Sequence, residues 1–401
     1  MTNSVKSAII VGAGIGGLTA AVALRRAGID VILCERSPQL RAAGFGLGLQ
    51  ANAMHALRTL ELGIDEQLLR VGARSRSVSY RRTDGSDLRR IDAAPVEAAL
   101  GAPSVGLARK DLHDVLLAAC GDYMQIELGA DALRYIEASD SVQVEFADGR
   151  ALRADVLIGA DGINSAIRAQ LHSVEPPRSG DYVAWLALAS FSHPAIEDGA
   201  HIQYWGRGMR FGINDIGRGR IYWWGTLTTT AELAANWPHG KDDLLERFSG
   251  WAPEIGELIT ATPESDILTL PAQDRPPLTE WGRGRVTLLG DAAHPMLTSL
   301  SQGANAAIED AVVLAHALAT CHDPATALRG YERRRIPRTT MLVNRSRTQA
   351  DLEQTTDPVL IEARDRFVVD AADNDRRSAL MEPMTWPGLG DPDPVHQGAP
   401  L

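Results

Sequence analysis

The chain has 401 residues, of which 45% are hydrophobic and 23% are charged, and its formal net charge is -11. This length allows two domains with separate cores, and the composition is that of a folded globular protein. The acidic balance disfavours a nucleic-acid partner, because an acidic surface repels phosphates unless basic residues are segregated on it. We interpret the one arginine-rich run, at residues 333–338, as the solvated face of a helix.

The cysteines and the apolar segments bear on location. Cys34, Cys120 and Cys321 are far apart and lack CxxC spacing, so they predict neither a disulfide framework nor a zinc site. No uninterrupted apolar run reaches the ~20 residues of a membrane-spanning helix. Glycines interrupt the apolar N-terminal segment, which argues against a signal peptide. We therefore expect a cytoplasmic protein with no membrane span.

The first predicted elements are a strand, a glycine-rich loop and a helix. Residues 8–11 form an apolar run typical of a buried parallel strand, and Gly12, Gly14 and Gly17 follow in the G-x-G-x-x-G spacing. The first glycine permits a tight turn, the second lets a pyrophosphate approach the backbone, and the third allows close helix packing. The free N–H groups of the first helical turn favour an anion at this point.

A returning strand at residues 30–34 completes this unit. It ends in Glu35, which follows Gly17 by roughly the 20 residues expected of the carboxylate that accepts hydrogen bonds from a ribose. The order of strand, glycines, helix, strand and acid favours a dinucleotide site. The alternative is a glycine-rich loop in an ordinary α/β protein.

Shorter elements follow between residues 41 and 146. Residues 41–51 are rich in glycine and predict a loop, and residues 52–72 have helical spacing. Asp84 and Gly85 predict a turn between two strands of a hairpin. The remaining predicted elements are the hairpin strands at 77–82 and 87–91, a helix at 110–120, and strands at 125–128 and 142–146.

A second apolar strand, residues 155–158, is followed by Asp161 and then by a helix that begins near residue 166. A carboxylate at the carboxyl end of a parallel strand is well placed for a ligand in the crevice above the sheet. It is equally suited to cap the helix, because aspartate accepts hydrogen bonds from free helix N–H groups. Both interpretations stay open.

Beyond residue 176 the pattern changes to an antiparallel sheet, with strand-like runs at 182–191, 201–205, 209–214 and 221–228. Aromatic residues are dense here, and they either fill the core of the sheet or line a pocket for a flat apolar ligand. Strand alternation alone does not say which residues face a ligand. The candidates for substrate contact are Trp185, Tyr204, Tyr222 and Trp224.

A third apolar strand, residues 286–289, ends at Gly290 and Asp291, and a long helix opens after Gln302. The N–H groups at residues 303–305 suit negative charge on a ligand in front of them. Further helices are predicted at 327–354 and 359–369, before a tail rich in glycine and proline.

Taken together, these segments resemble the single-component FAD-dependent aromatic hydroxylases, the group related to para-hydroxybenzoate and salicylate hydroxylases. The resemblance spans nearly the whole chain. It is carried by GAGIGG at residues 12–17 with Glu35 and Arg36, by GADGINSAIR at 159–168, and by GDAAHPM at 290–296 followed by QGANAAIEDA at 302–311.

The resemblance implies a Rossmann-like FAD-binding domain of the α/β class, a second domain built on an antiparallel sheet, and C-terminal helices. It implies that FAD is held by residues 1–76, 95–175 and 275–340 and the substrate by residues 77–94 and 176–274, and that residues 341–401 form the C-terminal part. The implied FAD contacts are Gly12, Ala13, Gly14, Ile15, Gly17, Glu35, Arg36, Arg41, Arg109, Leu133, Asp161, Gly290, Asp291, Gly303, Ala304 and Asn305. Pro295 and Thr298 join the substrate candidates.

The implied activity is that of an NADPH- or NADH-dependent monooxygenase. It would transfer one oxygen atom of O2, through a flavin C4a-hydroperoxide, to an aromatic or polycyclic apolar small molecule. The chain would be a monomer or a homodimer. No catalytic base is identified, and His294 is interpreted as structural.

Two departures from the family pattern bear on reactivity. Relatives commonly have proline where Thr298 stands and glycine where Ser301 stands, in a loop that passes close to the flavin. These changes keep open an alternative, a non-redox cyclase or binding protein on the same scaffold. A flavin-dependent halogenase is less favoured, because no lysine occurs between Lys6 and Lys110 and no W-x-W-x-I-P segment is present.

Overall fold

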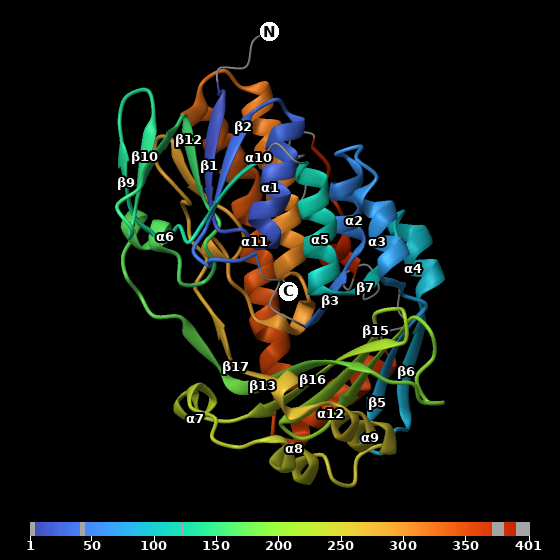
Figure 1. Ribbon diagram of the computed structural model, residues 1–401. Coiled ribbons are helices and arrows are strands. Elements are labelled where there is room, and N and C mark those ends of the chain that lie inside the picture. The colour runs from blue at the N-terminus through green and yellow to red at the C-terminus, as the bar shows by residue number, and fades with distance from the viewer. Residues whose placement is uncertain (1–4, 41–44, 122–123, 371–380, 390–401) are drawn as a thin grey trace.

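A computed structural model describes residues 5–40, 45–121, 124–370 and 381–389. Its upper part in Figure 1 is built on a five-stranded parallel sheet with the order β18-β12-β1-β2-β8. The three apolar runs predicted to be buried strands are β1, β12 and β18, which lie next to one another in this sheet. Their side chains are almost fully buried. The strands are β1 (Ser7–Val11), β2 (Asp30–Glu35), β8 (Gln125–Leu128), β12 (Val156–Gly159) and β18 (Val286–Leu288).

Helices α1 (Ile15–Arg26), α5 (Arg109–Cys120) and α10 (Gly303–Thr320) pack together against one face of this sheet (Figure 1). Gly16 permits close contact between α1 and α10, because a Cβ there would lie 2.6 Å from the Leu289 side chain and 3.2 Å from that of Ala307. On the other side lie a small antiparallel sheet and a short helix. These are β9 (Ala132–Glu137), β10 (Val142–Phe146), β11 (Ala151–Ala154) and α6 (Ala166–Leu171).

Two expectations for the segment after residue 41 need correction. The glycine-rich stretch contains a strand, β3 (Gly46–Leu49), which pairs with β7 (Val105–Ala108). The predicted helix at 52–72 is two helices, α2 (Ala51–Arg58) and α3 (Ile64–Val71), because the chain turns between them and Gly63 has a positive φ of 66°. Short elements complete this region, namely β4 (Ala73–Arg74) and α4 (Ala93–Leu100).

The lower part in Figure 1 is a seven-stranded sheet with the order β17-β13-β16-β15-β14-β5-β6. The predicted antiparallel strands are confirmed, as is the hairpin at Asp84 and Gly85, although β14 and β5 pair in parallel. Helices α7 (Ala231–Ala235), α8 (Lys241–Arg247) and α9 (Pro253–Ala261) cover the outer face. The strands are β5 (Ser77–Arg82), β6 (Asp87–Asp92), β13 (Arg178–Ser190), β14 (Ala200–Trp205), β15 (Met209–Asp215), β16 (Arg220–Thr228) and β17 (Leu268–Asp274).

The long helix α11 (Pro324–Glu353) connects the two parts, and α12 (Pro358–Asp370) lies beside β6 (Figure 1). The arginine-rich run was predicted to be solvated, but Arg335 on α11 is only 1% exposed. Its guanidinium forms ion pairs with Glu309 and Asp310 of α10, and Arg338 also pairs with Glu309. The arginines therefore neutralise buried carboxylates, a tertiary contact that a run of like charges does not reveal.

The described ranges contain four single-turn 3-10 helices, at Glu264–Asp266, Gly290–Ala292, Thr298–Leu300 and Glu382–Met384. Among the residues described, no helix is long and apolar enough to cross a membrane.

Candidate active site

The three predicted sites lie side by side at one edge of the parallel sheet. Val11 is in register with Gly159 on one side and with Cys34 on the other, and Gly159 is in register with Leu288. Segments that are more than 270 residues apart in the chain therefore end at the same edge. A crevice at the carboxyl ends of parallel strands is the usual ligand site of such sheets.

The glycine-rich loop has space for a ligand at one position and none at two others. A Cβ on Gly12, whose φ is 107°, would lie 2.3 Å from the Ala160 carbonyl oxygen, and a Cβ on Gly17 would lie 1.8 Å from that of Gly12. In contrast, nothing lies within 4 Å of a Cβ built on Gly14, which is the N-cap residue of α1 and makes no side-chain cap. The loop thus has no space for a side chain at Gly12 or Gly17, but it is open at Gly14, in front of the helix. A pyrophosphate needs this open position.

Glu35 lies beside this loop. Its Oε2 accepts a hydrogen bond from the Ala13 N–H at 3.0 Å, and its Oε1 accepts one from the Ser37 N–H at 2.9 Å. The carboxylate is therefore held at the carboxyl end of β2, beside the loop between β1 and α1, where a ribose is expected. The other residues expected near the adenosine are more exposed: Arg36 is at the surface and Leu133, on β9, is 60% exposed.

Ile15 is buried in the first turn of α1. Arg41 falls outside the described residues.

Asp161 caps α6, and this contact leaves its second carboxylate oxygen free for the ligand interpretation, which stays a prediction. Its Oδ2 accepts hydrogen bonds from the N–H groups of Ala166 and Ile167 at the start of α6. Its Oδ1 is buried without a hydrogen-bond partner among the described residues. Burial raises the pKa of this carboxyl group above its usual value, and hydrogen bonds with Ser165 and the backbone oppose the shift. One oxygen thus caps a helix while the other remains available to a ligand.

Arg109, which follows β7 of the three-stranded sheet, interacts with Asp291, which follows the third strand end of the crevice. Arg109 begins α5, its guanidinium lies 5.8 Å from the centre of the Phe45 ring, and Asp291 is the charged group that interacts with it. Burial lowers the pKa of Arg109, and the attraction of Asp291 opposes that effect. Asp291 follows Gly290, which has a positive φ of 61°, and its Oδ1 lies near Gly303 at the start of α10.

The loop before α10 is fixed by Asn305. Its side-chain amide donates to the carbonyl oxygens of Gly48 and Ser301, and its Oδ1 accepts a hydrogen bond from the Gln50 N–H. Nothing lies within 4 Å of a Cβ built on Gly48, so the surface between β3 and this loop is open. Ala304 is half-buried and Pro295 is fully buried.

The two departures from the family pattern have different structural contexts. Ser301 has a φ of 53°, in the left-handed region that glycine adopts most easily. The serine therefore keeps the backbone path for which glycine is suited. Thr298 is exposed, begins a single 3-10 turn and interacts with the Tyr182 hydroxyl of the seven-stranded sheet.

The seven-stranded sheet divides its aromatic residues between two faces. Tyr222 and Trp224 face the part built on the parallel sheet, where they pack with Phe45 and Ala108. A Cβ on Gly212, the partner of Trp224 on β15, would lie 2.0 Å from the indole, so the ring lies directly over the glycine. These two candidates therefore face the crevice side.

Trp185 and Tyr204 do not join them. Both belong to the core between the sheet and the outer helices, and the Trp185 ring makes edge contacts with Trp237 and Phe248. The Tyr204 hydroxyl donates to Glu254 and accepts a hydrogen bond from Arg81. Strand alternation places these two expected substrate residues on the face opposite to the crevice, because residues of odd and even position point to opposite sides.

A cavity of about 550 Å³ lies on the inner face of the sheet, between β5, β6, β14, α4, α12 and the end of α11. It reaches the loop before α10 at Leu300 and Ser301, and it reaches α2 at Gln50, next to Asn305. The apolar part of its wall is formed by Val78, Tyr80, Ile91, Val96, Leu100, Trp205, Leu300, Leu352, Phe367 and Val368.

Several residues of this wall were missed by sequence reasoning. His201 of β14 is one of them, and burial lowers its pKa to about 4, so the imidazole is neutral near pH 7. Glu353, Phe367 and Val368 come from C-terminal helices for which no contact was predicted. The available signal was Glu353 itself, a carboxylate at a helix C-terminus, where the helix dipole disfavours negative charge.

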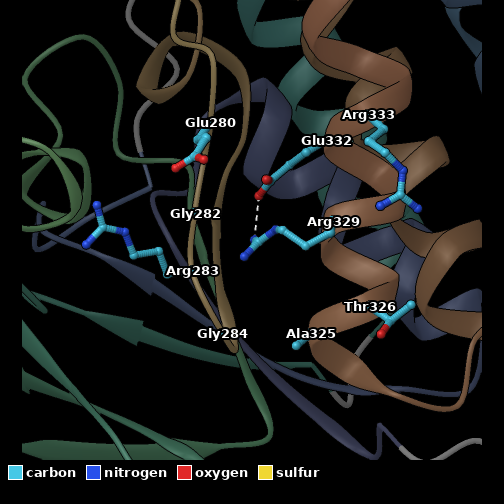
Figure 2. A pocket seen from close by; sticks show the side chains of 9 residues that line it. All are labelled: Glu280, Gly282, Arg283, Gly284, Ala325, Thr326, Arg329, Glu332 and Arg333. Carbon is cyan, nitrogen blue, oxygen red and sulfur yellow. Dashed lines mark hydrogen bonds and ion pairs between the residues drawn. The ribbon is translucent and has the colours of Figure 1, made fainter.

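A second pocket, of about 560 Å³, lies at the other edge of the parallel sheet (Figure 2). It is bounded by residues 282–284, before the amino end of β18, and by the first turns of α11. Figure 2 shows Arg329 beside Glu332, and Arg329 also donates to the Val286 carbonyl oxygen. These contacts join helix to strand at the edge opposite to the crevice, so this pocket is not part of the active site.

Comparison with known proteins agrees with this geometry. Residues 5–346 match the family model of the FAD binding domain. The chain is 40% identical over 330 residues to aurachin C monooxygenase/isomerase from Stigmatella aurantiaca. The aligned region covers 82% of this chain and 85% of the relative. It is 32% identical over 361 residues to FAD-dependent urate hydroxylase from Klebsiella pneumoniae, with 89% and 92% covered.

The crystal structure of Klebsiella pneumoniae HpxO complexed with FAD and uric acid superimposes with a TM-score of 0.88 at 29% identity, over 94% of this chain and 96% of the other. The fold and the comparisons indicate the same family. The fold combines a Rossmann-like sheet and an open glycine loop with an antiparallel sheet, and the comparisons match most of the chain. The chain belongs to the FAD-dependent flavoprotein monooxygenases, the family of the aromatic hydroxylases.

Proposed function

We propose that the protein uses FAD, NADPH or NADH, and O2 to hydroxylate or epoxidise an aromatic or polycyclic apolar molecule bound in the 550 Å³ cavity. The observation that supports this proposal is the position of the cavity. It reaches Ser301 and Gln50, which border the open surface at Gly48 and the start of α10. An apolar ligand there would lie next to the cofactor that the crevice fits.

FAD, when bound, accepts a hydride from the reduced nicotinamide and supplies the activated oxygen. The residues of the chain have three tasks around it. The N–H groups at the start of α10 stabilise negative charge on the cofactor. Gly12, Gly14 and Glu35 hold its adenosine diphosphate end, and the apolar wall keeps water from the reacting centre.

The alternative of a non-redox protein was kept open by Thr298 and Ser301. Ser301 retains the left-handed backbone expected of glycine, and Thr298 contacts Tyr182. Neither contact obstructs the space at Gly48, so we favour the monooxygenase. We further propose a cytoplasmic monomer or homodimer in which residues 77–94 and 176–274 form the substrate domain.

The purified protein tests this function directly. We expect a yellow protein with about one FAD per chain, and aromatic ligands that accelerate NADPH or NADH oxidation with matching O2 uptake. Hydroxylated or epoxidised product should be detected by mass spectrometry. A protein that holds flavin but never reduces it with either nicotinamide, whatever ligand is added, would support the non-redox alternative instead.

A further inference from the structure

One residue of the cavity wall, Glu353, belongs to a buried ion pair that the proposed chemistry does not use. Arg210 on β15 is 5% exposed and Glu353, the last residue of α11, lies almost completely inside the protein. The two form an ion pair, and the Arg210 guanidinium lies 4.6 Å from the centre of the Trp224 ring. Gln349, one turn earlier on α11, donates to the other oxygen of the Glu353 carboxylate.

The orientation of this pair follows from the sheet register. Arg210 is paired with Trp205 of β14 and with Thr226 of β16, and it shares the inner face with Gly212 and Trp224. Glu353 reaches the same face from α11 and lines the cavity. The arginine thus stands behind the wall beside an aromatic substrate candidate, and the glutamate stands in the wall itself.

The charges of the cavity wall balance. Three arginines (Arg89, Arg90 and Arg364) and three acids (Asp92, Glu97 and Glu353) line it, so their formal charges sum to zero. Several are engaged with partners of their own: Arg90 pairs with Glu197, Glu97 with Arg74, and Arg364 with Asp365. Only Glu353 is paired with a charge buried behind the wall.

A charged ligand would therefore find no net charge to compensate it. Burial of a carboxylate is strongly unfavourable unless a cation pairs with it, and Arg210, the buried cation nearest to Trp224, is already neutralised. The helix dipole disfavours a carboxylate at the end of α11, so Glu353 is not explained by helix stability.

We propose that Glu353 neutralises Arg210 in order to select uncharged aromatic substrates against aromatic carboxylates. This inference rests on the proposed function of the cavity, because it assigns the ligand class that the same site accepts. Glu353 and Arg210 act as specificity residues. Removal of the Glu353 charge alone leaves a buried guanidinium beside Trp224, which is a site for an anionic ring substituent.

The test compares two ligands with the same ring system, 2-naphthol and 6-hydroxy-2-naphthoate, which differ by one carboxylate. Binding to the FAD-loaded enzyme is measured by fluorescence quenching without NADPH or NADH, so no turnover occurs. For the wild type we expect naphthol to bind about tenfold more tightly than the naphthoate, or better. For Glu353→Gln we expect the naphthoate affinity to rise about tenfold, while the naphthol affinity changes little.

Two further variants make the result specific. Glu362→Gln on α12 removes an exposed glutamate that pairs with exposed Arg366, and it should leave both affinities unchanged. The double variant Arg210→Gln with Glu353→Gln removes both charges and should again reject the naphthoate. If Glu353→Gln does not fold, the ratio of the naphthol and naphthoate affinities in the wild type and in the double variant still tests the proposal.

Equal or preferred binding of the naphthoate by the wild type would overturn the proposal. So would a double variant that binds the naphthoate more tightly than the wild type does, because Arg210 would then not be the anion site. Absence of turnover with NADPH or NADH would count against the monooxygenase function but not against the binding preference, since the two are measured separately.

Discussion

The two large sheets present their functional residues in different ways. The five-stranded parallel sheet presents them at one edge, where Gly12, Asp161 and Asp291 follow the ends of adjacent strands and Glu35 is the last residue of β2. The seven-stranded sheet presents them on one face, where Trp224 and His201 alternate with residues that point the other way. A position after a strand identifies the first group, whereas only the register identifies the second.

The consequence is visible in two aromatic residues of one strand, β16. Trp223 and Trp224 are consecutive, yet Trp223 donates a hydrogen bond to Thr262 in the outer core while Trp224 lies over Gly212 on the inner face. A shift of one residue in the pairing would exchange their roles. The edge of the parallel sheet has no such ambiguity, because its functional residues are the last residue of a strand, as Glu35 is, or lie beyond the last paired position, as Gly12, Asp161 and Asp291 do.

The largest effect is expected at the edge of the parallel sheet, with Gly17→Ala. The new Cβ would lie 1.8 Å from the Gly12 carbonyl oxygen, so the loop must open and its N–H groups lose their alignment. We expect FAD affinity to fall about 100-fold or more, measured by flavin absorbance after dialysis.

The control for that change is Gly256→Ala on α9, where nothing lies within 4 Å of the added Cβ. This variant should retain its flavin. A Gly17→Ala protein with stoichiometric flavin would show that the loop does not hold the cofactor.

The difference between the two faces is tested by the pair Trp185→Ala and Trp224→Ala. Trp185 is fully buried in the outer core, so we expect its removal to cost about 3 to 5 kcal/mol in the free energy of unfolding, with little change in ligand affinity of the folded enzyme. Trp224 is only partly buried and lies against Arg210, whose partner Glu353 lines the cavity, so its removal should cost less stability and weaken naphthol binding about tenfold.

Urea unfolding and fluorescence titration measure the two quantities. The opposite pattern, with binding lost in Trp185→Ala and retained in Trp224→Ala, would mean that the register assigns the faces incorrectly.

A smaller effect concerns His201 and pH. Its pKa is lowered from 6.5 to about 4 by burial, and Arg210 contributes in the same direction. Between these values the unfolded chain binds more protons than the folded protein, so the free energy of unfolding decreases as the pH falls from 6.5 towards 4. Between pH 6.5 and 4, we expect the free energy of unfolding of His201→Gln to fall by about 1 to 3 kcal/mol less than that of the wild type. Urea unfolding at several pH values measures this difference.

The exposed His239 provides the control, since His239→Gln should leave the pH dependence as it is in the wild type. An identical pH dependence in His201→Gln and the wild type would show that the imidazole is not excluded from water in the folded protein.

The amino-acid sequence determined the parts that depend on neighbours in the chain. The glycine spacing predicted the closed turn at Gly12 and Gly17 and the open position at Gly14, because steric limits on φ and on Cβ act within a few residues. The strand ends with Asp161 and Asp291 were located for the same reason, and the matching motifs identified the family. Two local predictions were wrong: the helix at 52–72 is interrupted by a turn at Gly63 that the apolar spacing does not reveal, and the glycine-rich stretch before it contains β3, which depends on pairing with the distant β7.

The tertiary structure alone decided the parts that depend on distant contacts. Period-two alternation is the same on both faces of a strand, so the core position of Trp185 and Tyr204 and the inner position of Trp224 required the register and the helices that cover each face. The burial of Arg335 required α10 to supply Glu309 and Asp310. The pairing of Arg210 with Glu353 joins residues 143 positions apart, because α11 carries its last turn from one sheet to the other.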